Sequence, residues 1–394
     1  MESSNRIIYR SLVAFAVLSG MLMMTAGCSN SEVETSGSND VYTEVIDLPS
    51  LAQEDETRID SVEETNRSVN IEDALSEGLD FISLGNGNAI VAGIGECTDN
   101  YIVIPPTTPD GDTVTEIDNG AFSDCTNITG IFIPNTITVI GSDAFMGCTS
   151  LQSVSMPDDL YSLGYCAFSG CTALESIVIP DGVTEISGGA FAQCESLTSV
   201  YLPQTVNTIG ITSSEYDRPG AFQDCTNLTD INLPAGLEII GMNTFKGCSS
   251  LASVTIPDSV TTIGYCAFQE CGLTSVEIPE SVINMYALAF SNCDRLVTAN
   301  IHSHYLSRYM FSLCGVLSTV TLPEEGNIYL CDLSSTAYSA DVFDDCNRFE
   351  TINGVSPDEW VNSIGVRRVY LKVTSGSESV IEDSDEVLYY LGIN

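Results

Sequence analysis

The chain repeats one pattern of apolar and polar positions about every 23 residues. A phenylalanine, usually preceded by alanine, marks each return, and successive phenylalanines are 23, 23, 23, 31, 23, 23, 22, 21 and 32 residues apart. A cysteine follows each phenylalanine three residues later. The pairs are Phe122 and Cys125, Phe145 and Cys148, Phe168 and Cys171, Phe191 and Cys194, Phe222 and Cys225, Phe245 and Cys248, Phe268 and Cys271, Phe290 and Cys293, Phe311 and Cys314, and Phe343 and Cys346. A short unit that returns at a fixed period indicates coils stacked into a solenoid.

One unit shows how a coil is built. Val200 and Leu202 are two residues apart, which is the period of a strand, so both are expected to face inward with Leu197. Pro203 then ends the strand, because proline has no N–H to donate to a ladder. A single coil buries too few apolar side chains to offset the entropy of ordering its backbone. Stacking solves this problem, since neighbouring coils share a continuous core.

The repeat resembles a known family. Its pattern, I-P-x-x-V-x-x-I-G-x-x-A-F-x-x-C-x-x-L-x-x-[IV], is similar to that of BspA-like leucine-rich-repeat proteins over about residues 90–353. The segments 102–105 and 110–117 resemble that family's opening repeat. The resemblance implies a leucine-rich-repeat solenoid of the α/β type, with a right-handed coil array, a parallel strand ladder and short helical or irregular convex segments. It also implies kinship with bacterial surface adhesins that bind host extracellular proteins or other microbes.

The N-terminus predicts export and a lipid anchor. Arg6 and Arg10 precede an apolar stretch, residues 12–24, which ends in Thr25-Ala26-Gly27-Cys28. This order is typical of a lipoprotein signal peptide, so residues 1–27 are expected to be removed and Cys28 to be lipidated. Thr25 departs from the aliphatic residue that is commoner there. An ordinary secretory signal and a retained membrane anchor are the alternatives.

Composition divides the rest of the chain. Residues 28–80 are acidic and polar, and predict a disordered tether. Residues 81–353 are the predicted solenoid, and residues 354–394, which lack the repeat, are a predicted C-terminal cap. The formal net charge is -42, from 54 acidic and 12 basic residues. Such a chain repels phosphate backbones, so no nucleic-acid partner is expected, whereas cationic proteins, cations and neutral glycans remain open.

Positions that alternate with the core residues should line the concave face. That face is almost free of charge and rich in hydroxyl groups, which suits contact with a protein or a glycan. The alternative is that Ser, Thr and aromatic residues are there because they favour strands. An insertion around residues 211–220 is a second candidate. The candidate binding residues are Phe132, Ser155, Ser176, Val178, Ser199, Tyr201, Asn232 and Thr255 on the strands, and Tyr216 and Arg218 in the insertion.

Chemistry-bearing residues do not assemble into a known catalytic or metal motif. The periodic cysteines are expected to be a ladder of reduced, buried thiols, because parallel side chains would hold their Cβ atoms too far apart for a disulfide. Cys97, Cys166, Cys266 and Cys331 lie off this ladder, and the sequence leaves their redox state open. His302 and His304 are the only histidines, and are expected to be solvated rather than metal-bound. No cofactor is expected.

The predicted function is therefore recognition rather than catalysis. The order of anchor, tether and solenoid predicts a surface-exposed, lipid-anchored protein of the bacterial cell envelope that contacts the membrane through its lipid alone. Its expected partner is an extracellular protein or glycan, such as host matrix, mucin or another microbe. The alternative is a structural scaffold of the envelope without a host ligand. An enzyme would need convergent carboxylates near residues 300–394.

Overall fold

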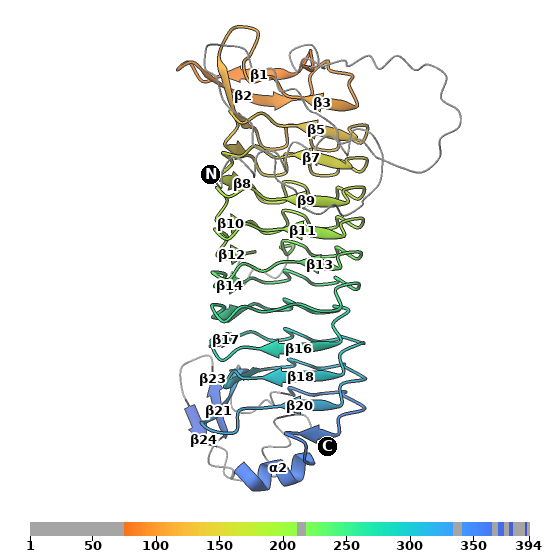
Figure 1. Cartoon of the computed structure of the whole chain (residues 1–394), viewed down its shortest axis with the longest axis vertical. Helices are drawn as coiled ribbons and strands as arrows, with labels where there is room; N and C mark the ends of the chain where they lie inside the picture. Colours follow the sequence, from red (N-terminus) through yellow and green to blue (C-terminus); the bar gives the residue numbers. More distant parts are fainter. Residues whose placement is uncertain are drawn as a thin grey trace, which may run out of the picture. The chain divides into compact units, whose positions relative to one another are not determined.

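A computed structural model describes residues 75–210, 218–333, 341–364, 369–373, 378–380 and 391. From residue 76 onward they belong to the unit Ser76–Asn394 and form a stack of parallel β coils, with one coil for each periodic phenylalanine (Figure 1). This confirms the predicted leucine-rich-repeat solenoid. The predicted signal peptide, Cys28 and nearly all of the tether lie outside the described residues, and the domain boundaries stay predictions.

The first strand ladder carries the L-x-x-[IV] segment of each coil. Inward residues such as Val200 and Leu202 are buried, as the strand period predicted. The ladder runs in three parallel sheets, β3-β5-β7, β13-β11-β9 and β16-β18-β20-β22, and residues 253–256 form no strand between the last two. Its strands are β3 (Tyr101–Val103), β5 (Gly130–Phe132), β7 (Ser153–Ser155), β9 (Ser176–Val178), β11 (Ser199–Tyr201), β13 (Asp230–Ile231), β16 (Ser275–Ile278), β18 (Thr298–Ile301), β20 (Thr319–Thr321) and β22 (Thr351–Ile352).

A second ladder, which the sequence did not reveal, carries the V-x-x-I-G segment. Most of its strands have two residues and bury one isoleucine or leucine each. The glycine that follows is required, since a Cβ on Gly164 would lie 2.4 Å from the carbonyl carbon of Gly141 in the preceding coil. The strands are β2 (Asn88–Gly93), β4 (Thr113–Ile117), β6 (Val139–Ile140), β8 (Ser162–Leu163), β10 (Glu185–Ile186), β12 (Thr208–Ile209), β14 (Ile239–Ile240), β15 (Thr262–Ile263) and β17 (Asn284–Met285).

The A-F-x-x-C segments form turns rather than helices. In every coil the residue before the ladder cysteine has a left-handed backbone, with φ between 56° and 76°. Glycine adopts this conformation freely, and a side chain there costs energy, so the chain cannot continue as a right-handed helix. The irregular alternative of the predicted convex side is therefore the one observed. The ten positions are Asp124, Gly147, Gly170, Gln193, Asp224, Gly247, Glu270, Asn292, Leu313 and Asp345.

The periodic phenylalanines form one continuous column in the core. All ten are at most 2 % exposed, and neighbouring rings stack with centroids 4.9–5.8 Å apart. From Phe122 to Phe311, each phenylalanine amide donates to a backbone carbonyl of the next coil, as Phe168 does to Ala190 at 2.8 Å. This third set of hydrogen bonds couples the coils on the turn side.

The ladder cysteines hydrogen-bond between coils as well as packing. From Cys148 to Cys346, each thiol donates to the carbonyl of the phenylalanine one coil earlier, at 3.0–3.3 Å. All ten are free thiols, in agreement with the predicted reduced ladder. Burial raises the pKa of Cys148 to about 12 and that of Cys194 well above its usual value, so both stay protonated at neutral pH.

Both ends of the stack are covered. At the N-terminal end, β1 (Asp80–Ser83) pairs antiparallel with β2, and the Ser76 backbone N–H donates to the Val103 carbonyl at 2.9 Å, on the outer edge of β3. At the other end, the Phe343 amide donates to the Leu391 carbonyl at 2.9 Å, which takes the place of the next coil.

A short helix and a small sheet complete the C-terminal part. Helix α2 (Pro357–Ile364) buries Trp360 and begins with a capping box, in which Ser356 and Glu359 exchange hydrogen bonds. The strands β19 (Tyr305–Ser307), β21 (Ile328–Leu333), β23 (Val369–Val373) and β24 (Glu378–Val380) form a four-stranded sheet. Among the described residues, no helix has both the length and the apolar character needed to cross a bilayer.

Candidate binding face

The candidate residues on the strands lie on the exposed face of the first ladder. Because side chains alternate along a strand, the residues flanking each buried valine or isoleucine point away from the core. In β9 the flanking residues Ser176 and Val178 are exposed, and in β11 Tyr201 is exposed. The strands that carry these residues lie one after another along the stack (Figure 1).

An aromatic and apolar patch occupies the N-terminal half of this face. Val178 and Tyr201 are paired residues on neighbouring strands and are 40 % and 52 % exposed. Phe132 on β5 is half-buried and pairs with Ser155 on β7. We call Phe132, Val178 and Tyr201 the aromatic patch. Apolar side chains exposed on adjacent strands of a rigid sheet suit a partner contact.

Tyr101 adds a further ring beside the patch. Its ring lies over Gly130, since a Cβ at that glycine would be 2.4 Å from the ring. The glycine interrupts a column that otherwise carries Ser153, Ser176 and Ser199. Sequence reasoning missed Tyr101, although its place two residues before Val103 in the opening strand was visible.

The remaining candidate residues on the strands differ in their exposure and in their hydrogen bonding within the fold. Ser176 and Thr255 are exposed, and Ser155 and Ser199 are half-buried. Asn232 is engaged within the fold: its Oδ1 accepts from the Leu202 amide at 3.0 Å and its Nδ2 donates to the Leu202 carbonyl at 2.9 Å. Its side chain thus joins the two coils where the backbone pairing of β11 and β13 stops.

The insertion contributes one described candidate. Arg218 is exposed, with its guanidinium carbon 5.6 Å from the centre of the Tyr165 ring, a cation–π contact. The Asn243 side chain donates to the Arg218 carbonyl at 3.2 Å, which fixes this end of the insertion on the next coil. Tyr216 lies outside the described residues.

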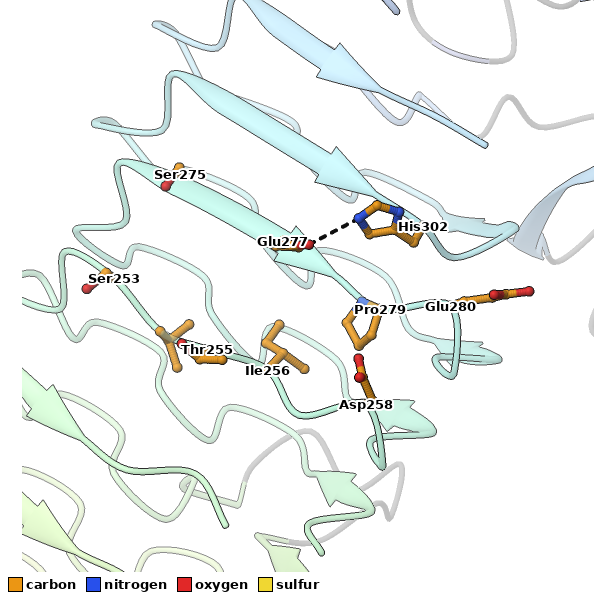
Figure 2. A pocket seen from close by; sticks show the side chains of 10 residues that line it. Ser253, Thr255, Ile256, Asp258, Ser275, Glu277, Pro279, Glu280 and His302 are labelled. Atoms are coloured by element: carbon orange, nitrogen blue, oxygen red, sulfur yellow. Dashed lines mark hydrogen bonds and ion pairs between the residues drawn. The ribbon is translucent and has the colours of Figure 1, made fainter. Parts of the chain in front are cut away.

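A hollow of about 580 Å³ opens on the same face, farther toward the C-terminus. It lies between residues 253–256, which form no strand, and β16, and its lining includes Asp258, Glu277 and His302 (Figure 2). His302 Nε2 is 3.1 Å from Glu277 Oε1, with these side chains 50 % and 73 % exposed. Sequence reasoning missed this site, because the hollow depends on the absence of strand pairing at residues 253–256.

The two histidines do not share a site. His304 Nδ1 is 2.9 Å from the Asn327 carbonyl, whereas His302 contacts Glu277 and Asn300. Within the part of the chain that the structure describes, no group of three or more His, Cys, Asp or Glu side chains is placed to hold a metal ion.

Stacked parallel coils, a core column of phenylalanine and cysteine, and one exposed strand face define the protein as a leucine-rich-repeat solenoid. More specifically, the chain belongs to the BspA-type leucine-rich repeat family, because the model of the BspA type leucine rich repeat region matches residues 111–216 and 218–346 in six copies. The resemblance seen in the repeat pattern is thus confirmed.

Solved structures that are similar to this chain come from several bacteria. A leucine-rich repeat protein from Bacteroides ovatus is 25% identical, covers 71% of this chain and 88% of its own, and has a TM-score of 0.48. A leucine rich cell surface protein from Faecalibacterium prausnitzii is 24% identical, with coverages of 70% and 86% and a TM-score of 0.36. A comparison with curated proteins found none that matches.

Proposed function

We propose that the chain is a lipid-anchored, surface-exposed binding protein of the bacterial cell envelope, which recognises an extracellular protein or glycan through the exposed face of its first ladder. The observation that carries this proposal is the aromatic patch. Tyr201 and Val178 lie on paired strands and expose apolar surface to solvent. The other side chains of this face are largely hydroxyl-bearing. The core does not need these side chains, whereas a partner can bury them.

Rigidity supports the same proposal. Val178 and Tyr201 lie on paired strands of one sheet, and their coils are joined by backbone, thiol and ring contacts. A partner therefore meets side chains that are already in position, and little conformational entropy is lost when it binds. The hydroxyl groups of Ser176 and Ser199 can donate and accept, which suits the backbone of a protein or the hydroxyls of a glycan.

The anchor is proposed from the sequence of residues 1–28. Cleavage before Cys28 and acylation of its thiol and amine would supply more than one chain, which is what stable attachment requires. Replacing Cys28 with Ala should abolish incorporation of labelled palmitate in bacteria that express the full chain. Unchanged labelling of the Cys28→Ala protein would refute the anchor without touching the binding face.

The binding role is tested by a screen of the full chain, displayed on bacteria, against matrix proteins, mucins and whole cells. A ligand found in this way should bind at least tenfold more weakly to the Phe132→Ser/Tyr201→Ser variant, since aromatic contacts of this kind contribute about 2 kcal/mol or more. The matched control is Tyr161→Ser, because Tyr161 is 61 % exposed but lies at the second ladder. Equal loss in both variants would refute the patch as the contact.

A scaffold of the envelope is the competing role. Crosslinking on live cells separates the two, because a scaffold would yield envelope proteins of the same cell and no external ligand. Recovery of those proteins alone, with unchanged crosslinking of the Phe132→Ser/Tyr201→Ser variant, would favour the scaffold.

A further inference from the structure

We propose that the hollow beside β16 is a binding site for the ammonium or guanidinium group of a lysine or arginine side chain on a cationic partner. The site lies on different coils from the aromatic patch. This proposal can therefore be tested independently of the function proposed above.

The first step is the opening between the coils. Residues 253–256 occupy the strand position of their coil, and Val254 corresponds to the buried core residues of the neighbouring strands. In the described part of the chain, however, no hydrogen bond joins their backbone to β13 or β16. The pairing stops at the 3.0 Å bond from the Thr274 amide to the Ala252 carbonyl. The backbone of residues 253–256, which line the hollow, thus has no partner in the described part of the ladder, and its carbonyl oxygens can accept from a ligand.

The second step is the charge of the lining. Asp258, Glu277 and Glu280 all line the hollow, and no lysine or arginine does. Figure 2 shows Glu277 on β16 next to His302, across from Thr255 and Ile256 on the coil that forms no strand. Three carboxylates near one opening favour a cation and oppose an anion, and the net charge of -42 attracts cationic partners from a distance.

The third step is the match of donors to acceptors. Ammonium carries three N–H donors and guanidinium five, with no acceptor on either, and the hollow offers carboxylate and carbonyl oxygens. Hydrogen bonds to a carboxylate from such groups are stronger than neutral ones. The apolar side chain of Ile256 and the ring of Pro279 can pack against the aliphatic stem of the ligand. A lysine or arginine side chain therefore satisfies both the polar and the apolar parts of the site.

The histidines supply a direct test, because the chain has two and only His302 lies at the hollow. Ring signals of both are followed by NMR in the full chain, at constant ionic strength, during titration with acetyl-lysine methylamide, acetyl-arginine methylamide or the neutral acetyl-norleucine methylamide. The signals of His302 should shift and saturate with either cationic probe and stay in place with norleucine. Those of His304, which contacts the Asn327 carbonyl, should not move with any of them.

Variants separate this site from general attraction of cations to an acidic protein. Glu277→Gln should weaken binding of the lysine probe roughly tenfold, the factor for one hydrogen bond to a charged group. Glu185→Gln should leave it unchanged, because Glu185 is also exposed but lies on β10 of the second ladder. Asp258→Asn serves if Glu277→Gln does not fold. Equal shifts at both histidines, no saturable shift at His302, or the same affinity in folded Glu277→Gln would each overturn the proposal.

Discussion

Truncating one ring of the phenylalanine column measures how the coils hold one another. Phe191 is fully buried, with its ring centre 5.6 Å from that of Phe168 and 5.5 Å from that of Phe222. Phe191→Ala should lower the free energy of unfolding by about 3–5 kcal/mol, the usual cost of a buried Phe→Ala change. About 0.5–1.5 kcal/mol of this belongs to each of the two ring contacts.

Pairs of variants isolate the contact between neighbours. Phe168→Ala and Phe191→Ala remove the same ring contact, so the double variant should lose about 0.5–1.5 kcal/mol less than the sum of the single losses. Phe168 and Phe245 are not stacked on each other, so their two losses should add to within about 0.5 kcal/mol. This contrast follows from the one-dimensional architecture, in which a coil contacts only its neighbours.

Guanidinium unfolding, followed by far-UV circular dichroism and by fluorescence, provides the measurement. Trp360 is the single tryptophan and is buried in α2, so its fluorescence reports on the C-terminal end while dichroism reports on all coils. The two transitions should coincide in the unaltered chain if the stack unfolds as one unit. Additive losses for the neighbouring pair, or equal coupling in both pairs, would refute the nearest-neighbour interpretation.

Three further changes test other parts of the fold by the same unfolding measurement. Leu313→Gly should raise the free energy of unfolding by about 1 kcal/mol, because Leu313 is exposed and has a φ of 61°, which glycine adopts without cost. A lower free energy of unfolding in this variant would contradict this prediction. Gly164→Ala should destabilise by about 2 kcal/mol or more, since its Cβ would collide with the backbone of Gly141. Burial raises the pKa of Cys148 from 9.0 to about 12, so its contribution is complete below pH 9 and is lost as pH rises from 9 through 12. The free energy of unfolding should fall by about 1.4 kcal/mol per pH unit for each such thiol. In the Cys148→Ala variant, the free energy of unfolding should therefore fall less steeply with pH, by the same amount of about 1.4 kcal/mol per pH unit.

Most of the fold could be predicted from the repeat in the sequence. Val200 and Leu202 revealed the first ladder because strand periodicity and the following proline agree. The second ladder was hidden because strands such as β10 have only two residues, too few for alternation to be seen. The left-handed turns had a visible signal, since glycine, aspartate and asparagine fill seven of the ten positions before the ladder cysteines.

Part of the candidate site could likewise be predicted from the sequence, and part could not. Tyr201 and Val178 could be placed outward from strand periodicity alone, and both are exposed. Asn232 shared their column, but its use of the Leu202 backbone depends on where pairing between β11 and β13 stops. The hollow had a faint signal: Cys271 and Leu273 are separated by one residue where most other coils have two, directly after the coil that forms no strand.

In this architecture, the residues that stabilise the fold differ from those proposed to recognise a partner. The thiol of Cys194, the ring of Phe191 and the backbone of the turns join one coil to the next without involving the exposed face. A substitution at Tyr201 or Glu277 removes no buried group, so its effect on stability should stay within about 0.5 kcal/mol. The exposed face can therefore differ from coil to coil while the core repeats. For this reason the aromatic patch and the hollow, where the face departs from plain serine and threonine, are the places at which function is to be sought.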